Sequence, residues 1–194
     1  MKSDIILAGV GGQGILSIAA TIGTAAVAEG LYLKQAEVHG MSQRGGDVQS
    51  HLRVSDSPIA SDLIPAGKAD LIISVEPMEA LRYADMLSDS GWIITNISPF
   101  ININNYPEPE AIYAEIKKIK NHVIIDADRI AKDLGTAKAA NIVILGAAAK
   151  FIDMPFESFE KALKAIFGRK GDKVVEMNIA ALHAGAKAAD EYIG

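Results

Sequence analysis

The sequence contains no cysteine among its 194 residues. A chain without thiolates cannot form disulfides, hold a cysteine-ligated iron–sulfur cluster or a zinc–thiolate site, or use a cysteine nucleophile. Any electron transfer in which this protein takes part must therefore use a cofactor or a partner supplied from elsewhere. The four histidines, His39, His51, His122 and His183, do not follow HExxH or another paired-ligand spacing, so we expect no metal site.

Clustered positive charge is also lacking. The chain has 19 Lys and Arg against 24 Asp and Glu, a net charge of −5, and no run of five basic residues. Nucleic-acid binding depends on clustered Lys and Arg that displace counterions from phosphates. The densest basic group, Lys117-Lys118-Ile119-Lys120, is typical of the solvated end of a helix. We therefore expect no nucleic-acid partner.

Long apolar segments are missing as well. The stretch 15–28 is interrupted by Ser17, Thr21 and Thr24 and is too short and polar to span a bilayer. The N-terminus leads almost directly into an apolar strand, without the basic region and cleavage site of a secretory signal. We expect a cytoplasmic protein with no membrane contact.

What the sequence does contain is a regular alternation of short apolar runs and helical patterns. We expect strands at 5–10, 31–38, 48–55, 70–75, 91–96 and 122–125, and helices at 12–29, 77–87, 110–119, 139–152, 156–167 and 173–192. Buried strands separated by helices predict a parallel sheet. Segment 48–55 instead alternates with period two, which favours an antiparallel or edge strand. The expected fold is one α/β domain over residues 1–194, with a three-layer, mostly parallel Rossmann-like sheet, an antiparallel edge strand and a helical C-terminal region.

A glycine-rich loop follows the first predicted strand. Gly9-Val10-Gly11-Gly12-Gln13-Gly14 satisfies GxGxxG and opens a helix, whose first N–H groups and dipole favour an anion. Glu37 ends the second strand, roughly where a ribose-binding carboxylate would lie. The motif indicates either nucleotide binding or docking of a partner's backbone. A free-standing NAD- or FAD-binding oxidoreductase is one alternative, although the chain leaves little room for a separate substrate domain.

Several other polar residues follow predicted strands. Glu76 precedes Pro77 at the start of a helix, and Asp126 and Asp128 resemble an acid–base pair at the start of another. N-capping is the favoured interpretation for these acids. Asn96 ends a strand and is expected to be a turn former.

A second polar segment, from Glu37 to Gly46, is the most unusual part of the sequence. Its glycines permit backbone conformations that other residues avoid. Arg44 offers a planar fork for a carboxylate or a phosphate, and His39 can donate, accept or titrate near neutrality. A solvated hairpin in which Arg44 pairs with Glu37 is the alternative.

Together these two motifs resemble the gamma-type domain of 2-oxoacid:ferredoxin oxidoreductases, which share a GGQG element and a later Arg-Gly-Gly element. His39-Gly40-Met41-Ser42-Gln43-Arg44-Gly45-Gly46 is similar to the small subunit of the indolepyruvate branch of this family in particular. The pyruvate branch usually has Tyr-Gly-x-Glu-x-Arg-Gly-Gly instead. The likeness extends over roughly residues 4–190 in element order and length, and is specific in these two motifs.

The resemblance implies a subunit of an enzyme that oxidatively decarboxylates 2-oxoacids to acyl-CoA and passes electrons to ferredoxin. Thiamine diphosphate and iron–sulfur clusters would belong to a larger partner subunit, and this chain would hold no cofactor alone while helping to shape the substrate or CoA pocket. His39, Gln43 and Arg44 would face the shared site. The accompanying binding or docking residues would be Gly9, Gly11, Gly12, Gln13, Gly14, Met41, Ser42, Gly45 and Gly46. A purely structural subunit is the second alternative.

Arg44→Ala should lower the turnover of the assembled enzyme without unfolding the chain, because the guanidinium would hold a substrate carboxylate or a CoA phosphate. Steady-state kinetics of the complex and a thermal melt of the subunit measure the two effects. Unchanged kinetics would exclude this role for Arg44.

Overall fold

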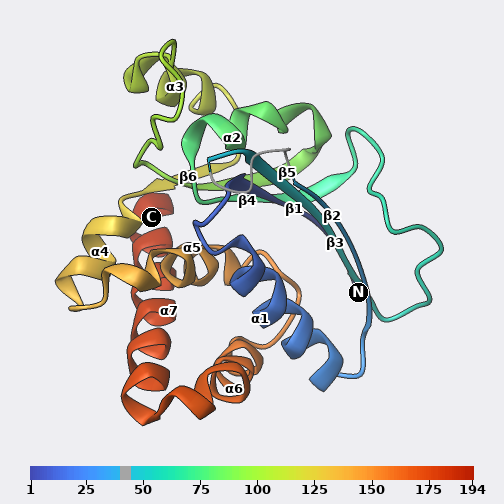
Figure 1. The fold of residues 1–194 in the computed structure, drawn as a ribbon. Coiled ribbons are helices and arrows are strands. Elements are labelled where there is room, and N and C mark those ends of the chain that lie inside the picture. Colours follow the sequence, from blue (N-terminus) through green and yellow to red (C-terminus); the bar gives the residue numbers. More distant parts are fainter. Residues whose placement is uncertain (40–44) are drawn as a thin grey trace.

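A six-stranded sheet in the order β2-β3-β1-β4-β5-β6 forms the centre of the computed structural model, which describes residues 1–39 and 45–194 (Figure 1). Its strands are β1 (Lys2–Val10), β2 (Tyr32–His39), β3 (Asp47–Ser55), β4 (Ala69–Ser74), β5 (Leu87–Asn96) and β6 (His122–Ile125). Parallel pairing joins β1, β4, β5 and β6, whereas β3 is antiparallel to both β1 and β2. Since β2 consequently points in the same direction as β1, β3 is the one reversed strand among those described.

This sheet confirms the predicted α/β fold but places the antiparallel strand differently. Segment 48–55 is antiparallel, as its pattern indicated, yet it lies inside the sheet and β2 forms the edge. Polar and apolar residues alternate along this segment because the two faces of β3 contact different parts of the protein. Leu52 and Val54 pack into the larger core, while Arg53 and His51 on the opposite face bond to the loop 56–68, for example through the Ile64 N–H to His51 Nδ1 (3.0 Å).

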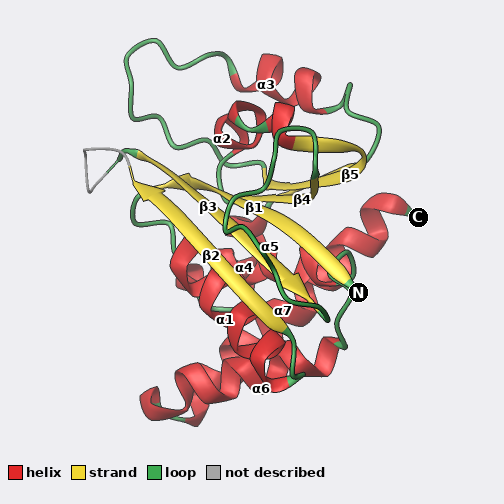
Figure 2. Cartoon of the chain, turned by 90° about the vertical axis from the view of Figure 1, so that its right-hand side faces the viewer, coloured by secondary structure: helices red, strands yellow, loops and turns green. Residues whose placement is uncertain are grey.

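Helices cover both faces of the sheet and give three layers (Figure 2). One face carries α1 (Ile15–Ala28), α4 (Ala127–Asp133), α5 (Ala140–Ala149), α6 (Phe156–Phe167) and α7 (Asp172–Ile193), and the other carries α2 (Pro77–Arg82) and α3 (Pro109–Ile116). Short 3-10 turns occupy Ala84–Met86, Ala137–Ala139 and Gly168–Lys170. The predicted helix 77–87 was too long, because Leu87 pairs with Ala69 and begins β5. None of the described helices is long and apolar enough to cross a membrane.

The hydrophobic core consists of two clusters separated by the sheet. Along β1, Ile5 and Leu7 point into the larger cluster beneath α1 and α5, whereas Ile6 points into the smaller one beneath α2 and α3. This is the period-two alternation of a strand that is buried on both faces. The continuous apolar run of β1 therefore follows from its central position.

The closest helix contact in the larger core joins α5 to α7 through two glycines. A Cβ built on Gly146 would lie 1.9 Å from the Leu182 carbonyl oxygen, and one on Gly185 would lie 1.9 Å from the Val143 carbonyl oxygen. The two backbones can approach this closely because neither glycine carries a side chain. This contact holds α5, whose residues 142–149 are all buried, between α7 and the sheet.

Gly185→Ala should lower the free energy of unfolding by about 1–3 kcal/mol, because the added methyl group overlaps backbone atoms of α5 and forces the helices apart. Urea denaturation measures this change. Gly168→Ala is the matched control, since Gly168 has a helical backbone and open space around it, and it should be neutral or slightly stabilising. Equal stability of the two variants would contradict the close contact.

Candidate functional site

The glycine loop, residues 9–14, carries the chain from the carboxyl end of β1 into α1. Gly12 and Gly14 have φ angles of 100° and 84°, which side-chain-bearing residues rarely adopt. Gln13 closes the turn in two ways, since its Oε1 accepts the Val10 N–H (2.8 Å) and its own N–H donates to the Val10 carbonyl (3.1 Å). The Gln13 side chain, predicted as a binding group, thus also holds the loop in shape.

Gly9 serves packing at the start of this loop. A Cβ on Gly9 would lie 2.4 Å from Val75 Cγ2 and 2.9 Å from Ile15 Cδ1. The absence of a side chain lets the end of β1 approach both the segment after β4 and the first turn of α1. Gly9 was predicted with the binding residues, and its surroundings indicate a structural role.

The second glycine motif lies directly beside the first. Val10, the last residue of β1, pairs with Asp47, the first residue of β3. One step further, the Gly11 N–H donates to the Gly46 carbonyl (2.9 Å), and Asn102 Nδ2 donates to the Gly45 carbonyl (2.5 Å). The structure therefore places Gly45 and Gly46 beside the glycine loop.

The other predicted residues of this motif are only partly placed. His39 is the last residue of β2, at the same edge of the sheet, and only its backbone position is described. Met41, Ser42, Gln43 and Arg44 lie outside the described residues. Their predicted roles stay predictions.

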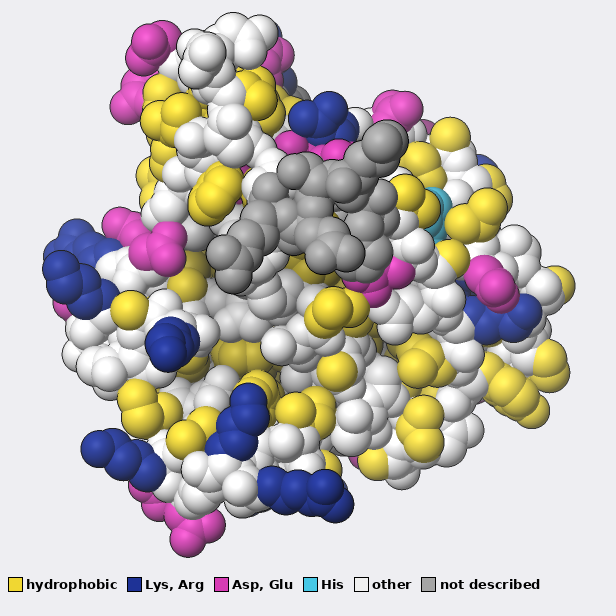
Figure 3. Space-filling view, in the orientation of Figure 1, with side chains coloured by type: hydrophobic (Ala, Val, Ile, Leu, Met, Phe, Trp, Pro, Cys, Tyr) yellow, Lys and Arg dark blue, Asp and Glu magenta, His cyan; other side chains and the backbone are white. Residues whose placement is uncertain are grey.

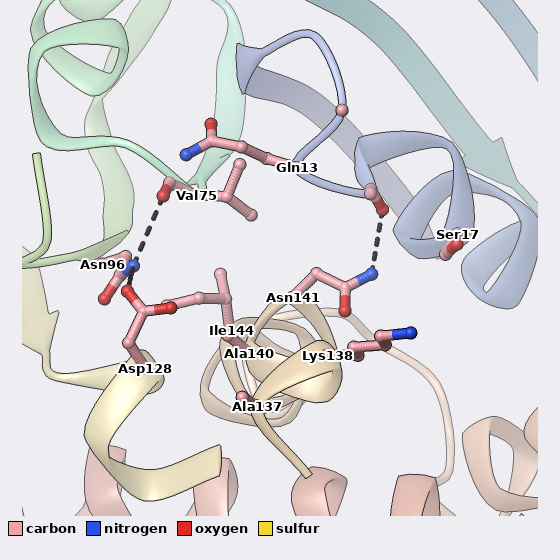
Figure 4. Close-up of a pocket in the computed structure, with 12 residues that line it drawn as sticks. Gln13, Ser17, Val75, Asn96, Asp128, Ala137, Lys138, Ala140, Asn141 and Ile144 are labelled. Atoms are coloured by element: carbon pink, nitrogen blue, oxygen red, sulfur yellow. Dashed lines mark hydrogen bonds between the residues drawn. The ribbon is translucent and has the colours of Figure 1, made fainter. Parts of the chain in front are cut away.

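A cavity of about 410 Å³ opens at the carboxyl edge of the parallel strands, on the side of the glycine loop that faces α5 (Figure 4). Its walls come from the glycine loop, α1, the segment after β4, the last residue of β5, α4, the 3-10 turn 137–139 and α5. They consist of Gly12, Gln13, Gly14, Ser17, Val75, Asn96, Asp128, Ala137, Lys138, Ala140, Asn141 and Ile144. This volume is within the range of small-molecule pockets, and the position is where open α/β sheets place their ligands.

One side of this cavity carries an amide–carboxylate pair. Asn96 is buried and donates through Nδ2 to Asp128 Oδ2 (2.9 Å), while its Oδ1 accepts the Ala127 N–H (3.1 Å). Asn96 thereby fixes the first turn of α4 and the direction of the Asp128 carboxylate. This side of the cavity is suited to accept hydrogen bonds from a ligand.

The opposite side carries groups suited to an anion. Figure 4 shows Ser17, Lys138 and Asn141 on the opposite side of the cavity from Asn96 and Asp128, with the Lys138 ammonium directed away from that pair. Asn141 Nδ2 donates to the carbonyl of Gly14 (3.0 Å), the N-cap residue of α1, and so ties α5 to the glycine loop. Gly14 and Ser17 belong to this wall, so the start of α1, which is the positive end of its dipole, borders the cavity. The cavity is therefore polarised between a cationic side and a carboxylate side.

A smaller hollow of about 300 Å³ lies on the side of the glycine loop that faces β2 and β3, with Glu37 in its wall. Glu37 belongs to β2, which β3 separates from β1, and its Oε2 accepts from Gln35 Nε2 (3.3 Å). In dinucleotide-binding folds the strand that bears the ribose-binding acid lies next to the first strand. The expected equivalence of Glu37 to that acid is therefore not supported by the strand order.

The acidic residues that follow strands have separate functions. Glu76 Oε2 accepts the Glu79 N–H (2.8 Å) and Asp126 Oδ1 accepts the Arg129 N–H (2.9 Å), which confirms both as N-caps. Asp128 is not a cap but a wall residue of the cavity.

Sequence reasoning missed most of the cavity wall. Asn96 was interpreted as a turn former, although its place at the carboxyl end of a parallel strand was a usable signal. Lys138 and Asn141 follow no strand, and Asn141 reaches the glycine loop only because α5 packs beside it. No group of three or more His, Cys, Asp or Glu that could hold a metal occurs among residues 1–39 and 45–194, and without cysteine the chain does not fit an iron–sulfur cluster.

Comparisons with known proteins identify the family to which this chain is related. The model of the family described as pyruvate ferredoxin/flavodoxin oxidoreductase matches residues 4–188. The indolepyruvate oxidoreductase subunit IorB of Archaeoglobus fulgidus is 39% identical over 192 residues, 95% of this chain and 94% of the relative. The subunit of the same name from Pyrococcus horikoshii is 36% identical over 98% of this chain and 97% of its own length.

A solved structure shows the same fold within a longer chain. The 2-oxoglutarate:ferredoxin oxidoreductase from Magnetococcus marinus, solved with 2-oxoglutarate, coenzyme A and succinyl-CoA bound, matches with a TM-score of 0.79 at 20% identity. The match covers 98% of this chain and 31% of that one. With the family model and both relatives spanning nearly the whole sequence, this chain belongs to the pyruvate ferredoxin/flavodoxin oxidoreductase family.

Proposed function

We propose that this chain is the small, cluster-free subunit of a 2-oxoacid:ferredoxin oxidoreductase of the indolepyruvate type. The observation that carries the proposal is the 39% identity to an indolepyruvate oxidoreductase subunit IorB over nearly the full length of both chains. The complex would convert an arylpyruvate and CoA to an acyl-CoA and carbon dioxide, with ferredoxin as the electron acceptor. This subunit would be inactive without its partner.

The proposed division of labour follows from the side chains available. Iron–sulfur clusters need thiolate ligands, which this chain lacks, so they would belong to the larger subunit together with thiamine diphosphate. Thiamine diphosphate supplies the carbanion chemistry of decarboxylation when it is bound there. The present chain would bind and orient the substrates.

The polarised cavity supports CoA as the ligand of this subunit. A phosphate group would lie on the cationic side, near Lys138 and the start of α1, where an anion is favoured. Asn96 and Asp128 would accept hydrogen bonds from N–H or O–H groups of the same ligand. From the motif beyond β2, Arg44 would hold a substrate carboxylate or a further phosphate, with His39 and Gln43 beside it.

Reconstitution tests the proposed function. The candidate large subunit should reduce viologen with indolepyruvate, CoA and thiamine diphosphate only when this chain is present, because part of the substrate site would be absent without it. Full activity of the large subunit alone would contradict the proposal, as would a complex that is inactive on every 2-oxoacid. Tight NAD or FAD binding by the isolated chain would then favour a nucleotide-binding oxidoreductase.

Lys138→Ala should raise the KM for CoA about two- to five-fold at low ionic strength and leave kcat nearly unchanged, because an exposed charge contributes modestly to binding. The effect should shrink as salt is added, since salt screens exposed charges. Lys132→Ala, an exposed lysine of α4 outside the cavity wall, is the matched control. Equal KM values for the two variants would exclude Lys138 from CoA binding.

A further inference from the structure

We propose that exposed hydrophobic side chains around the carboxyl edge of the sheet form the surface onto which the larger catalytic subunit docks. This inference rests on the proposed function and adds the location of the interface. The surface, called the docking rim below, consists of Leu16, Val38, Phe100, Ile101 and Ile103, with exposed fractions of 56%, 61%, 42%, 70% and 43%. Large apolar side chains gathered at one edge of a protein commonly mark an interaction site.

The docking rim is assembled from separate parts of the chain. Leu16 lies in the first turn of α1, directly after the glycine loop, and Val38 lies one residue before the end of β2. The other members follow the carboxyl end of β5. Because β1, β2 and β5 point in the same direction, all these segments meet at one edge of the sheet.

Hydrophobic and charged side chains are unevenly distributed over the face of the molecule seen in Figure 3. Figure 3 shows hydrophobic side chains beside α3 and over α1, whereas Lys and Arg gather over α4 and α6. Charged side chains are depleted at the centres of protein interfaces and apolar ones are enriched.

The loop 97–107 holds its part of the docking rim in a fixed position. Glu76 is fully buried, and its Oε1 accepts both the Phe100 N–H (3.2 Å) and the Tyr106 hydroxyl. Burial and the neighbouring Glu76 carboxylate raise the pKa of Tyr106 still further above neutrality, so the hydroxyl remains the donor in this pair. Asn102 provides a second anchor through its bond to the Gly45 carbonyl. A loop ordered in this way loses little conformational entropy when it binds a partner.

The position of the cavity indicates which partner covers this edge. The cavity opens at the carboxyl edge, where Gly45 and Gly46 also lie beside the glycine loop, and the iron–sulfur clusters of the proposed complex would have to come from another chain because this one has no cysteine. That chain has to reach the same edge to act on a ligand bound there. In the Magnetococcus enzyme the similar unit is 31% of a longer chain, so this fold does occur there attached to the remainder of an oxidoreductase.

Dilution of the purified complex tests the docking rim. Complexes that carry Ile101→Asp or Ile103→Asp in the small subunit should lose half of their activity at a concentration at least about ten-fold higher than the wild-type complex, as expected for substitutions within an interface. Above that concentration kcat should equal the wild-type value, because neither residue lines the cavity. Ile101→Ser removes apolar surface without adding charge and should shift the midpoint in the same direction.

Val27→Asp is the matched control. Val27 is 64% exposed and lies in the last turn of α1, at the opposite end of the helix from Leu16. The complex with this variant should lose half of its activity at the same concentration as the wild-type complex. Thermal melts should show all variants folded. If the wild-type chains form no active complex, the proposed function itself fails. If the wild-type complex forms but the isoleucine variants do not shift its midpoint, or Val27→Asp shifts it equally, the docking rim alone is overturned.

Discussion

The antiparallel pairing of β3 with β1 is the interaction on which the candidate site depends. Its register sets Asp47 opposite Val10, so the segment entering β3 ends beside the segment leaving β1, and the Gly11–Gly46 hydrogen bond continues the contact beyond the strands. Two glycine motifs distant in sequence thus share one edge. Had β2 paired directly with β1, Glu37 would have taken the ribose-binding position of a dinucleotide fold. The inserted strand instead places Gly45 and Gly46 beside the glycine loop.

The remaining strands complete the site because they are parallel to β1. These strands end at the same edge, where Val75 follows β4, Asn96 is the last residue of β5 and Asp128 lies in the helix after β6. Asn96 links the end of β5 to the start of α4, because its side chain forms hydrogen bonds with both the Ala127 N–H and the Asp128 carboxylate. The result is a candidate binding site in a chain without cysteine, which suits the proposed role of a subunit whose redox chemistry another chain would supply.

The sequence was sufficient for features determined by local patterns. The limits of β6 and α6 were predicted correctly, as was the glycine loop between strand and helix, because period, caps and glycines act over a few residues. The internal position of β3 was not predictable. Alternating polar and apolar residues show that the two faces of a strand have different surroundings, but not whether the strand lies inside the sheet or at its edge. The cavity wall was missed because it depends on contacts between distant parts of the sequence. The hydrogen bond from Asn141 to Gly14 joins residues 127 positions apart, and the sequence around either residue does not predict it.

Packing remote from the edge determines where that wall lies. Gly146 and Gly185 allow α7 to press against α5, and α5 in turn lies on the sheet with Asn141 in its first turn. If larger residues separated the helices, Asn141 would move relative to Gly14 and the cationic side of the cavity would change shape. The glycines of the core and those of the glycine loop therefore affect the same site. Gly146 and Gly185 determine the position of α5, and Gly12 and Gly14 allow the turn whose backbone Asn141 binds. Ligand affinity should consequently depend on core packing as well as on the residues that touch the ligand.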